Sequence, residues 1–171
     1  MVEKKEIEEK EFTPTYKIAL LIASVSEDLS MVERDIDTME LVCQFIGIKD
    51  IRKVDSKQDA EAELENIENE FRAAHNRTTN GIFLFVYYSG HGEMTQGLFK
   101  KKEKVYSLPG WFVSCNFGDE LLNLEQSLRN LAQYSNTCTI GVLECCRNAK
   151  VRSKDSSKTG NFQFIFGCRE G

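Results

Sequence analysis

The sequence predicts an α/β domain with a mostly parallel sheet and helices on both faces. Residues 81–89 and 139–144 are continuous apolar runs of strand length, rich in aromatic and β-branched residues, as in strands buried on both faces. Runs of this kind alternate along the chain with stretches of helical periodicity. That order is typical of a parallel sheet whose crossover helices cover both faces.

The outer strands and the long connection follow from local composition. Residues 16–25 form a first buried strand, and the more charged residues 48–54 form a shorter strand nearer the sheet edge. Residues 161–166 form the last strand. Residues 94–118 read as an irregular surface hairpin, with the wall of a substrate groove as the alternative, because connections this long are usually functional or mobile.

Three helices are predicted from capping signals and apolar spacing. Ser30 with Glu33 makes a capping box for the first, Ser56 with Asp59 caps the second, and residues 123–134 form the third. Gly47 suits the C-terminal cap of the first helix. The residues expected to face the core are Val32, Ile36, Met39, Cys43 and Ile46 on the first helix, Ala60, Leu64, Ile67, Phe71 and Ala74 on the second, and Leu124, Leu128 and Leu131 on the third.

Length and composition favour a single domain. The chain has 171 residues, of which 41% are hydrophobic, enough to build one core. Residues 1–13 are a charged N-terminal lead-in, and residues 14–171 are the domain itself. Within it, residues 150–160 are polar and lack an apolar period, so we expect a flexible linker there.

Charge and cysteine usage exclude several classes of partner. The net charge is −5, and no Lys/Arg cluster is interleaved with aromatic residues, which argues against nucleic acid. No apolar run is long enough for a membrane span, and no leader peptide is recognisable, so we expect a cytoplasmic protein with reduced thiols. The six cysteines form no Cys-x-x-Cys and the two histidines lie far apart; we therefore expect no metal and no cofactor.

Two motifs follow neighbouring strands of the predicted sheet. Ser89-Gly90-His91-Gly92 ends one buried strand, and Glu144-Cys145-Cys146-Arg147 ends another. The carboxyl ends of parallel strands are where open α/β sheets bind their ligands. A histidine and a thiol brought together at this edge would form a nucleophilic pair.

These motifs resemble the caspase clan of cysteine peptidases. The histidine-to-cysteine separation is 146 − 91 = 55 residues, against about 50 in the caspase signature. The acid-x-Cys-Arg pattern is closer to paracaspases and metacaspases than to caspases. The resemblance covers residues 16–171 and implies a caspase-like three-layer αβα sandwich, a large-subunit-like portion whose C-terminal strand or strands are missing from this sequence.

The resemblance also implies the catalytic roles. Cys146 is the nucleophile, His91 is the proton shuttle, and the backbone N–H groups of Gly92 and Cys146 form the oxyanion hole. Cys145 competes with Cys146 for the role of nucleophile. Adjacent residues of a strand face opposite ways, and the family pattern assigns Cys146 to the site and Cys145 to the core.

Substrate choice follows from two acids that the resemblance places in the pocket for the residue before the cut. These are Glu144, two residues before the nucleophile, and Asp35 in the first helix, with Asp37 as the near alternative. Two neighbouring carboxylates repel each other unless a cation lies between them. The predicted activity is therefore an endopeptidase that cleaves protein or peptide substrates after Arg or Lys.

Two other functions compete with this hypothesis. The chain could be a catalytically inactive caspase-like module that pairs as a homodimer or with a second caspase-like chain, since an exposed edge strand favours pairing. An unrelated flavodoxin-like binding domain is the third option. It is poorly supported, because no glycine-rich phosphate loop follows the first strand.

Overall fold

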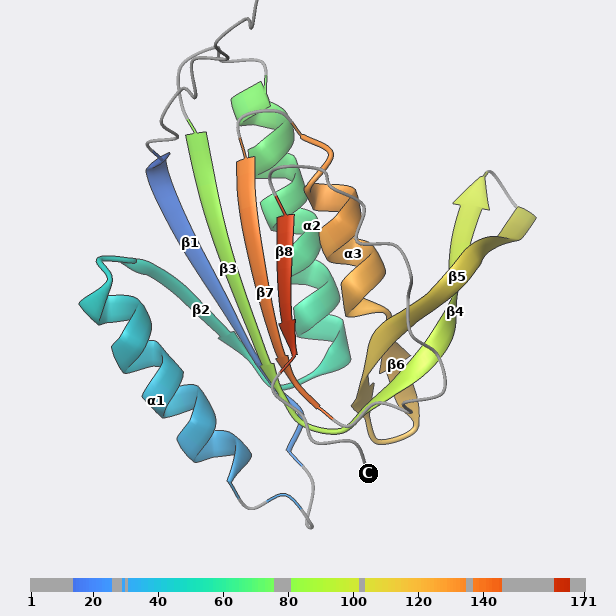
Figure 1. Cartoon of the computed structure of the whole chain (residues 1–171), viewed down its shortest axis with the longest axis horizontal. Helices are drawn as coiled ribbons and strands as arrows, with labels where there is room; N and C mark the ends of the chain where they lie inside the picture. The colour runs from blue at the N-terminus through green and yellow to red at the C-terminus, as the bar shows by residue number, and fades with distance from the viewer. Residues whose placement is uncertain are drawn as a thin grey trace, which may run out of the picture.

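A five-stranded parallel sheet forms the centre of the molecule (Figure 1). The computed structural model describes residues 14–25, 29, 31–75, 81–101, 104–134, 137–145 and 162–166. The sheet has the order β2-β1-β3-β7-β8. Its strands are β1 (Pro14–Ala23), β2 (Asp50–Val54), β3 (Gly81–Ser89), β7 (Thr137–Glu144) and β8 (Phe162–Phe166). The predicted α/β class is confirmed, with the short charged strand β2 at one edge.

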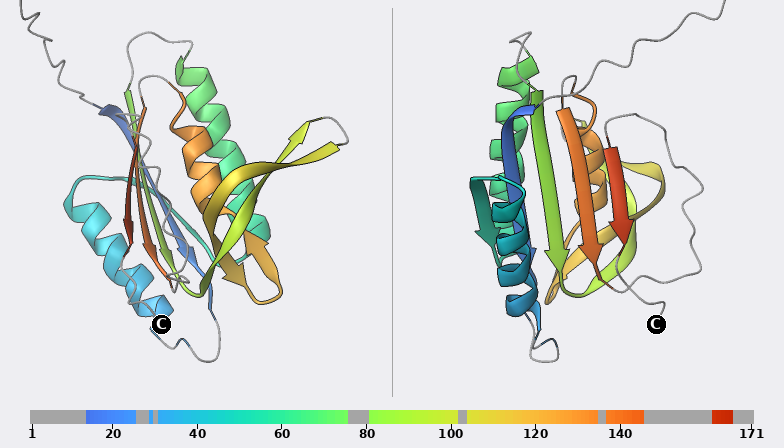
Figure 2. Two further views of the ribbon diagram at one scale, coloured as in Figure 1. Left: turned by 45° about the vertical axis from the view of Figure 1, so that its right-hand side comes forward. Right: turned by 60° about the vertical axis from the view of Figure 1, so that its left-hand side comes forward.

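Helices cover both faces of the sheet, which makes three layers (Figure 2). α1 (Val32–Phe45) packs on one face, and α2 (Lys57–His75) and α3 (Leu124–Leu131) pack on the other. Side chains of a strand alternate between its two faces, so each inner strand contributes to both cores. Ala19, Leu21 and Tyr87 belong to the core beneath α1, and Leu20, Ile22 and Tyr88 belong to the core beneath α2 and α3.

The predicted apolar faces of the helices are largely confirmed. Of the thirteen predicted residues, ten are buried, Met39 and Ala74 are partly buried, and Ile46 is 46% exposed. Ile46 was wrongly assigned to the core. It is the C-cap of α1, one residue beyond the last helical turn, so the helical period no longer sets its direction. Gly47 follows with φ +80°, as expected for a C-terminal cap.

The two predicted capping boxes have different outcomes. Ser56 accepts a hydrogen bond from the Asp59 N–H at 3.1 Å and donates to its carboxylate at 2.7 Å, which confirms the cap of α2. α1 begins at Val32 with Met31 as N-cap, and Met31 makes no side-chain cap hydrogen bond. Ser30 lies outside the described residues, so its capping box with Glu33 stays a prediction. Glu33 and Asp35 in the first turn still complement the helix dipole.

A second sheet replaces the irregular hairpin predicted at 94–118. β4 (Gly92–Lys101), β5 (Lys104–Phe117) and β6 (Glu120–Leu122) form an antiparallel sheet beside α3 (Figure 1). The regularity was missed because these strands are held by cross-strand backbone pairing and lack a continuous apolar run. β5 is fastened to α3 by Glu125, whose buried carboxylate accepts from the Val113 N–H at 2.8 Å and is paired with Arg129 at 2.8 Å.

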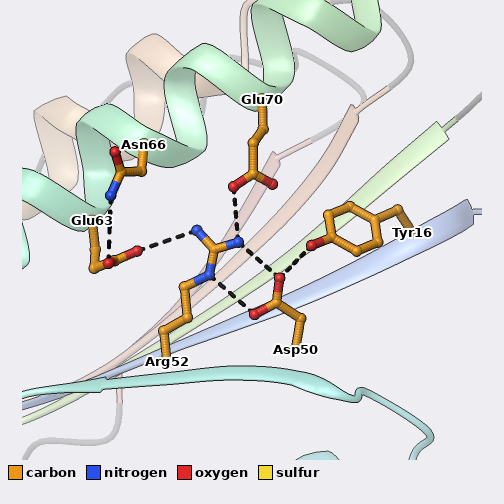
Figure 3. Close-up of polar contacts among 6 residues, drawn as sticks. All are labelled: Tyr16, Asp50, Arg52, Glu63, Asn66 and Glu70. Carbon is orange, nitrogen blue, oxygen red and sulfur yellow. Dashed lines mark hydrogen bonds and ion pairs between the residues drawn. The ribbon is translucent and has the colours of Figure 1, made fainter.

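An ion network fastens the edge strand β2 to α2 (Figure 3). The Arg52 guanidinium lies 2.7 Å from Asp50, 3.2 Å from Glu63 and 2.8 Å from Glu70. Asp50 also accepts a hydrogen bond from the Tyr16 hydroxyl on β1. Because its five donors can satisfy several carboxylates at once, one arginine links two strands and a helix.

Two predicted segments lie outside the described residues. They are the charged lead-in at 1–13 and the linker at 150–160. Cys146 also lies outside them, so the site is described from the residues that surround its motif.

Candidate active site

Three parallel strands end together at the site. Ala23, Ser89 and Glu144 close β1, β3 and β7 in register, with Ala23 opposite Ser89 and Ser89 opposite Glu144. The Ser24 N–H donates to the Ser89 carbonyl at 2.9 Å, and the Gly90 N–H donates to the Glu144 carbonyl at 3.3 Å. The two sequence motifs therefore meet at the carboxyl edge of the sheet, where α/β folds bind ligands.

Gly90 allows the chain to leave β3 in a tight bend. Its φ is +153°, a region that L side chains rarely adopt, and it is buried. A Cβ here would lie 2.6 Å from the Ser24 Cβ and 2.7 Å from the Tyr88 Oη. Gly92 opens β4 opposite Cys115, so the second glycine of the motif continues into regular pairing. The bend directs His91 out of the strand.

The backbone of His91 is held by two donors. Its carbonyl accepts from the Tyr88 hydroxyl and, at 3.0 Å, from the Asn116 N–H. Burial raises the pKa of the Tyr88 phenol, so the hydroxyl stays protonated and remains a donor. The Ser24 hydroxyl donates to the Asn116 carbonyl and so links the end of β1 to the same set of hydrogen bonds. His91 itself is half-buried, anchored between β3 and the second sheet.

Three of the four described cysteines are buried, and Cys138 is partly buried. Cys145 is 2% exposed and packs in the core beneath α2 and α3, which confirms the core assignment that the family pattern implied. Burial raises the pKa of Cys115 well above its usual range and, together with the charge of Glu40, raises the pKa of Cys43 to about 11. Burial also raises the pKa of Cys138. Because the thiolate is the reactive form, these three thiols are poor nucleophiles near neutral pH.

Two carboxylates face the α1 side of the same strand ends. Asp35, in the first turn of α1, accepts from the Ser89 hydroxyl at 3.0 Å, and Glu144 accepts from the Tyr87 hydroxyl at 2.5 Å. Burial, followed by Glu144 and then by the charge of Asp35, raises the pKa of Tyr87. The pKa of the Tyr87 phenol is therefore affected by both carboxylates. Among the described residues, neither carboxylate forms an ion pair.

Asp37, the alternative to Asp35, faces elsewhere. Its carboxylate lies 3.9 Å from the Lys53 ammonium on β2, and its side chain is 75% exposed. Asp35 and Asp37 are two residues apart on a helix, so they do not share a face. The structure thus brings Asp35, but not Asp37, to the ends of β3 and β7.

Residues 16–171 match the family model described as the caspase domain. The chain belongs to the caspase-domain family. At the level of the family, a caspase domain is a cysteine peptidase, a hydrolase that acts on protein substrates. The resemblance to the caspase clan over residues 16–171 is confirmed, and the closer likeness to paracaspases and metacaspases stays a prediction.

The similarity to a solved structure is one of fold. The crystal structure of protein GSU0716 from Geobacter sulfurreducens aligns with a TM-score of 0.50 at 17% identity. The alignment covers 77% of this caspase domain and 50% of that protein, so the chain spans about half the length of its structural relative. No curated protein shows significant sequence similarity to this caspase domain.

Within the ranges that the structure describes, no group of three or more His, Cys, Asp or Glu side chains is placed to hold a metal ion. No helix in those ranges combines the length and apolarity needed to cross a membrane.

The residues that support the motifs were not found from the sequence. The sequence predicts no role for the hydroxyls of Tyr87, Tyr88 and Ser89, nor for Ser24 and Asn116. Strand alternation could have separated Tyr87 from Tyr88, since adjacent residues serve opposite faces. Asn116 carries no such signal, because its contact with His91 depends on how the second sheet folds back.

Proposed function

We propose that this caspase domain is a cysteine endopeptidase that cleaves after Arg or Lys, with Cys146 as nucleophile and His91 as proton shuttle. The observation that supports it best is the pair of carboxylates, Asp35 and Glu144, beside the His91 loop. Both accept hydrogen bonds only from neutral hydroxyls among the described residues. Their negative charges therefore remain available to a substrate guanidinium or ammonium, which a charge-assisted hydrogen bond would hold.

The likeness to the family pattern acid-x-Cys assigns the role of nucleophile to Cys146, and the burial of Cys145 supports that choice. Cys145 faces the core at the end of β7, while Glu144 faces the α1 side. Cys146 itself lies outside the described residues, so its place beside the two acids is part of the proposal.

The reaction then proceeds through a thioester. The Cys146 thiolate attacks the carbonyl carbon of the scissile bond, and the oxyanion accepts from the N–H groups of Gly92 and Cys146, donors of a kind worth about 2.7–4 kcal/mol each. His91 gives its proton to the leaving amine as the C–N bond breaks. Water, deprotonated by His91, attacks the thioester, which releases the acid product and restores the thiolate.

A covalent label tests the nucleophile and the pocket together. An arginine-directed peptidyl inhibitor with a thiol-reactive group is incubated with the wild type, Cys146→Ala and Cys145→Ala, and the intact masses are measured. We expect one label on the wild type and on Cys145→Ala, and none on Cys146→Ala. An inhibitor with aspartate in place of arginine is the matched control, and we expect it to label none of the three.

A pairing module is the second candidate, and β8 favours it. β8 ends the described sheet, and Ile165 on it is 47% exposed. An unpaired strand edge is a template for pairing with another chain. If the wild type takes no label and sedimentation equilibrium shows a dimer, the catalytic proposal fails and pairing replaces it.

A further inference from the structure

The edge strand β2 borders a cavity whose lining contains none of the proposed catalytic or pocket residues. Among the described strands, β2 pairs with β1 alone, so its other edge carries no strand (Figures 1 and 2). A cavity of about 580 Å³ lies at the carboxyl end of β2, between the N-terminal turns of α1 and α2. This volume is within the usual range for ligand sites, roughly 300–1,000 Å³. We call it the β2 groove.

The walls of the β2 groove combine apolar surface with negative charge. Ala23, Ile36 and Val54 are among its apolar lining residues. Its charged lining consists of five carboxylates and one ammonium, a net charge of 1 − 5 = −4: Glu33, Asp37, Asp55, Asp59, Glu63 and Lys53. Long basic side chains suit such walls, because their methylene stems pack on apolar surface while the charged ends reach carboxylates.

The internal cations leave part of this charge uncompensated. Lys53 is paired mainly with Glu40 at 2.7 Å, outside the lining, and lies 3.9 Å from Asp37. Glu63 is already engaged by Arg52 at 3.2 Å. Glu33 and Asp55 form no ion pair among the described residues. The complementary partner therefore carries positive charge.

The distribution of the acids favours an extended chain over a point charge. Glu33 and Asp37 come from α1 on one face of the sheet, and Asp59 and Glu63 come from α2 on the other. No three of the described acids are close enough to hold a metal ion. An extended peptide sends successive side chains to opposite sides, so neighbouring basic residues could reach the acids of α1 and α2 in turn.

We propose that the β2 groove binds an extended Lys/Arg-rich segment of a partner protein, laid alongside β2 so that backbone pairing adds to charge recognition. Strand addition of this kind uses main-chain hydrogen bonds for affinity and side-chain pockets for specificity. β1 and β3 separate β2 from β7 in the sheet. Binding here does not depend on the proposed peptidase activity.

Fluorescence anisotropy tests the proposal directly. The probe is a short labelled peptide of lysine, arginine and valine, added to the full chain carrying Cys146→Ala, so that cleavage cannot occur. The groove variant is Glu33→Gln with Asp55→Asn. The control, Glu65→Gln with Asp119→Asn, makes the same two chemical changes at exposed positions outside the lining. Thermal melts establish that each variant is folded.

We expect the groove variant to bind the probe roughly fivefold more weakly, as the loss of two partly solvated charge pairs implies. The control should change the affinity less than twofold. Affinity should fall steeply at 1 M salt, where the screening length is about 3 Å. A probe methylated on alternate backbone nitrogens, which cannot pair with a strand, should bind more weakly. Equal binding by the groove and control variants, or equal binding of the methylated probe, would overturn the proposal.

The carboxylate pocket beside His91 is a competing site for a basic probe. A third variant, Asp35→Asn with Glu144→Gln, separates the two. If it binds the probe as tightly as the parent chain, the probe occupies the β2 groove. If it alone loses binding, the inference fails while the proposed preference for basic substrates gains support.

Discussion

Two clusters of acids lie on opposite sides of β1, and they differ in what neutralises them. Asp50, Glu63 and Glu70 surround the guanidinium of Arg52, within 2.7–3.2 Å (Figure 3). Asp35 and Glu144 accept hydrogen bonds from the hydroxyls of Ser89 and Tyr87 instead. A hydroxyl satisfies an oxygen atom without cancelling its charge, so the second cluster keeps its attraction for a cation.

The difference distinguishes a structural ion network from the proposed pocket for a basic side chain. The Arg52 network is complete without a ligand, and the Arg52 side chain is only 19% exposed. The pair beside His91 resembles the same arrangement with its cation left out. A substrate arginine would there take the place that Arg52 holds in the network.

Neutralising Asp35 and Glu144 should strongly reduce cleavage after Arg. Asp35→Asn and Glu144→Gln each remove a charge-assisted contact worth about 1.5–3 kcal/mol, so each should lower kcat/KM by about 10- to 100-fold and the double variant by more. Asp37→Asn is the matched control, because its carboxylate faces Lys53. Steady-state kinetics on an arginyl substrate measures the effect. An equal loss in Asp37→Asn would show that overall negative charge, and not the pair, attracts the substrate.

Filling the bend before His91 should destabilise the fold. Gly90→Ala places a Cβ 2.6 Å from Ser24 at φ +153°, and we expect the free energy of unfolding to fall by about 2–4 kcal/mol. Gly118→Ala, at φ +69° with no atom within 4 Å of the added Cβ, carries only the backbone strain, about 1–2 kcal/mol. Urea unfolding compares the two. If they are equally destabilised, the close approach of Ser24 and Tyr88 contributes nothing.

Breaking the Arg52 network should lower the stability of the fold and leave catalysis unchanged. Arg52→Met leaves three acids without their shared cation, and because the site is partly solvated we expect a loss of about 1–3 kcal/mol in the free energy of unfolding. The value of kcat/KM for an arginyl substrate should change by less than about twofold, which corresponds to a change of less than about 0.4 kcal/mol in the activation free energy. Lys57→Met, which removes the weaker contacts to Glu61 and Glu120 at 3.8 and 3.6 Å, is the control. A large loss of activity in Arg52→Met would mean that β2 and the site are coupled.

Local pattern accounted for most of the fold. The apolar periods of α1, α2 and α3 placed ten of thirteen predicted residues in the core, and the Ser56 cap was recognised. The second sheet was missed because β4 and β5 are defined by pairing with each other, which no single segment encodes.

Spacing along the chain predicted the two strand-end motifs, the resemblance they carry and the opposite faces of Cys145 and Cys146, because spacing encodes which face of a strand or helix a residue occupies. Contacts in the folded chain bring Asp35, not Asp37, to the strand ends, hold the His91 carbonyl with Tyr88 and Asn116, and gather the acids of α1 and α2 beside β2. These contacts join segments distant in the chain. Their geometry depends on strand register and helix packing, which local spacing does not specify.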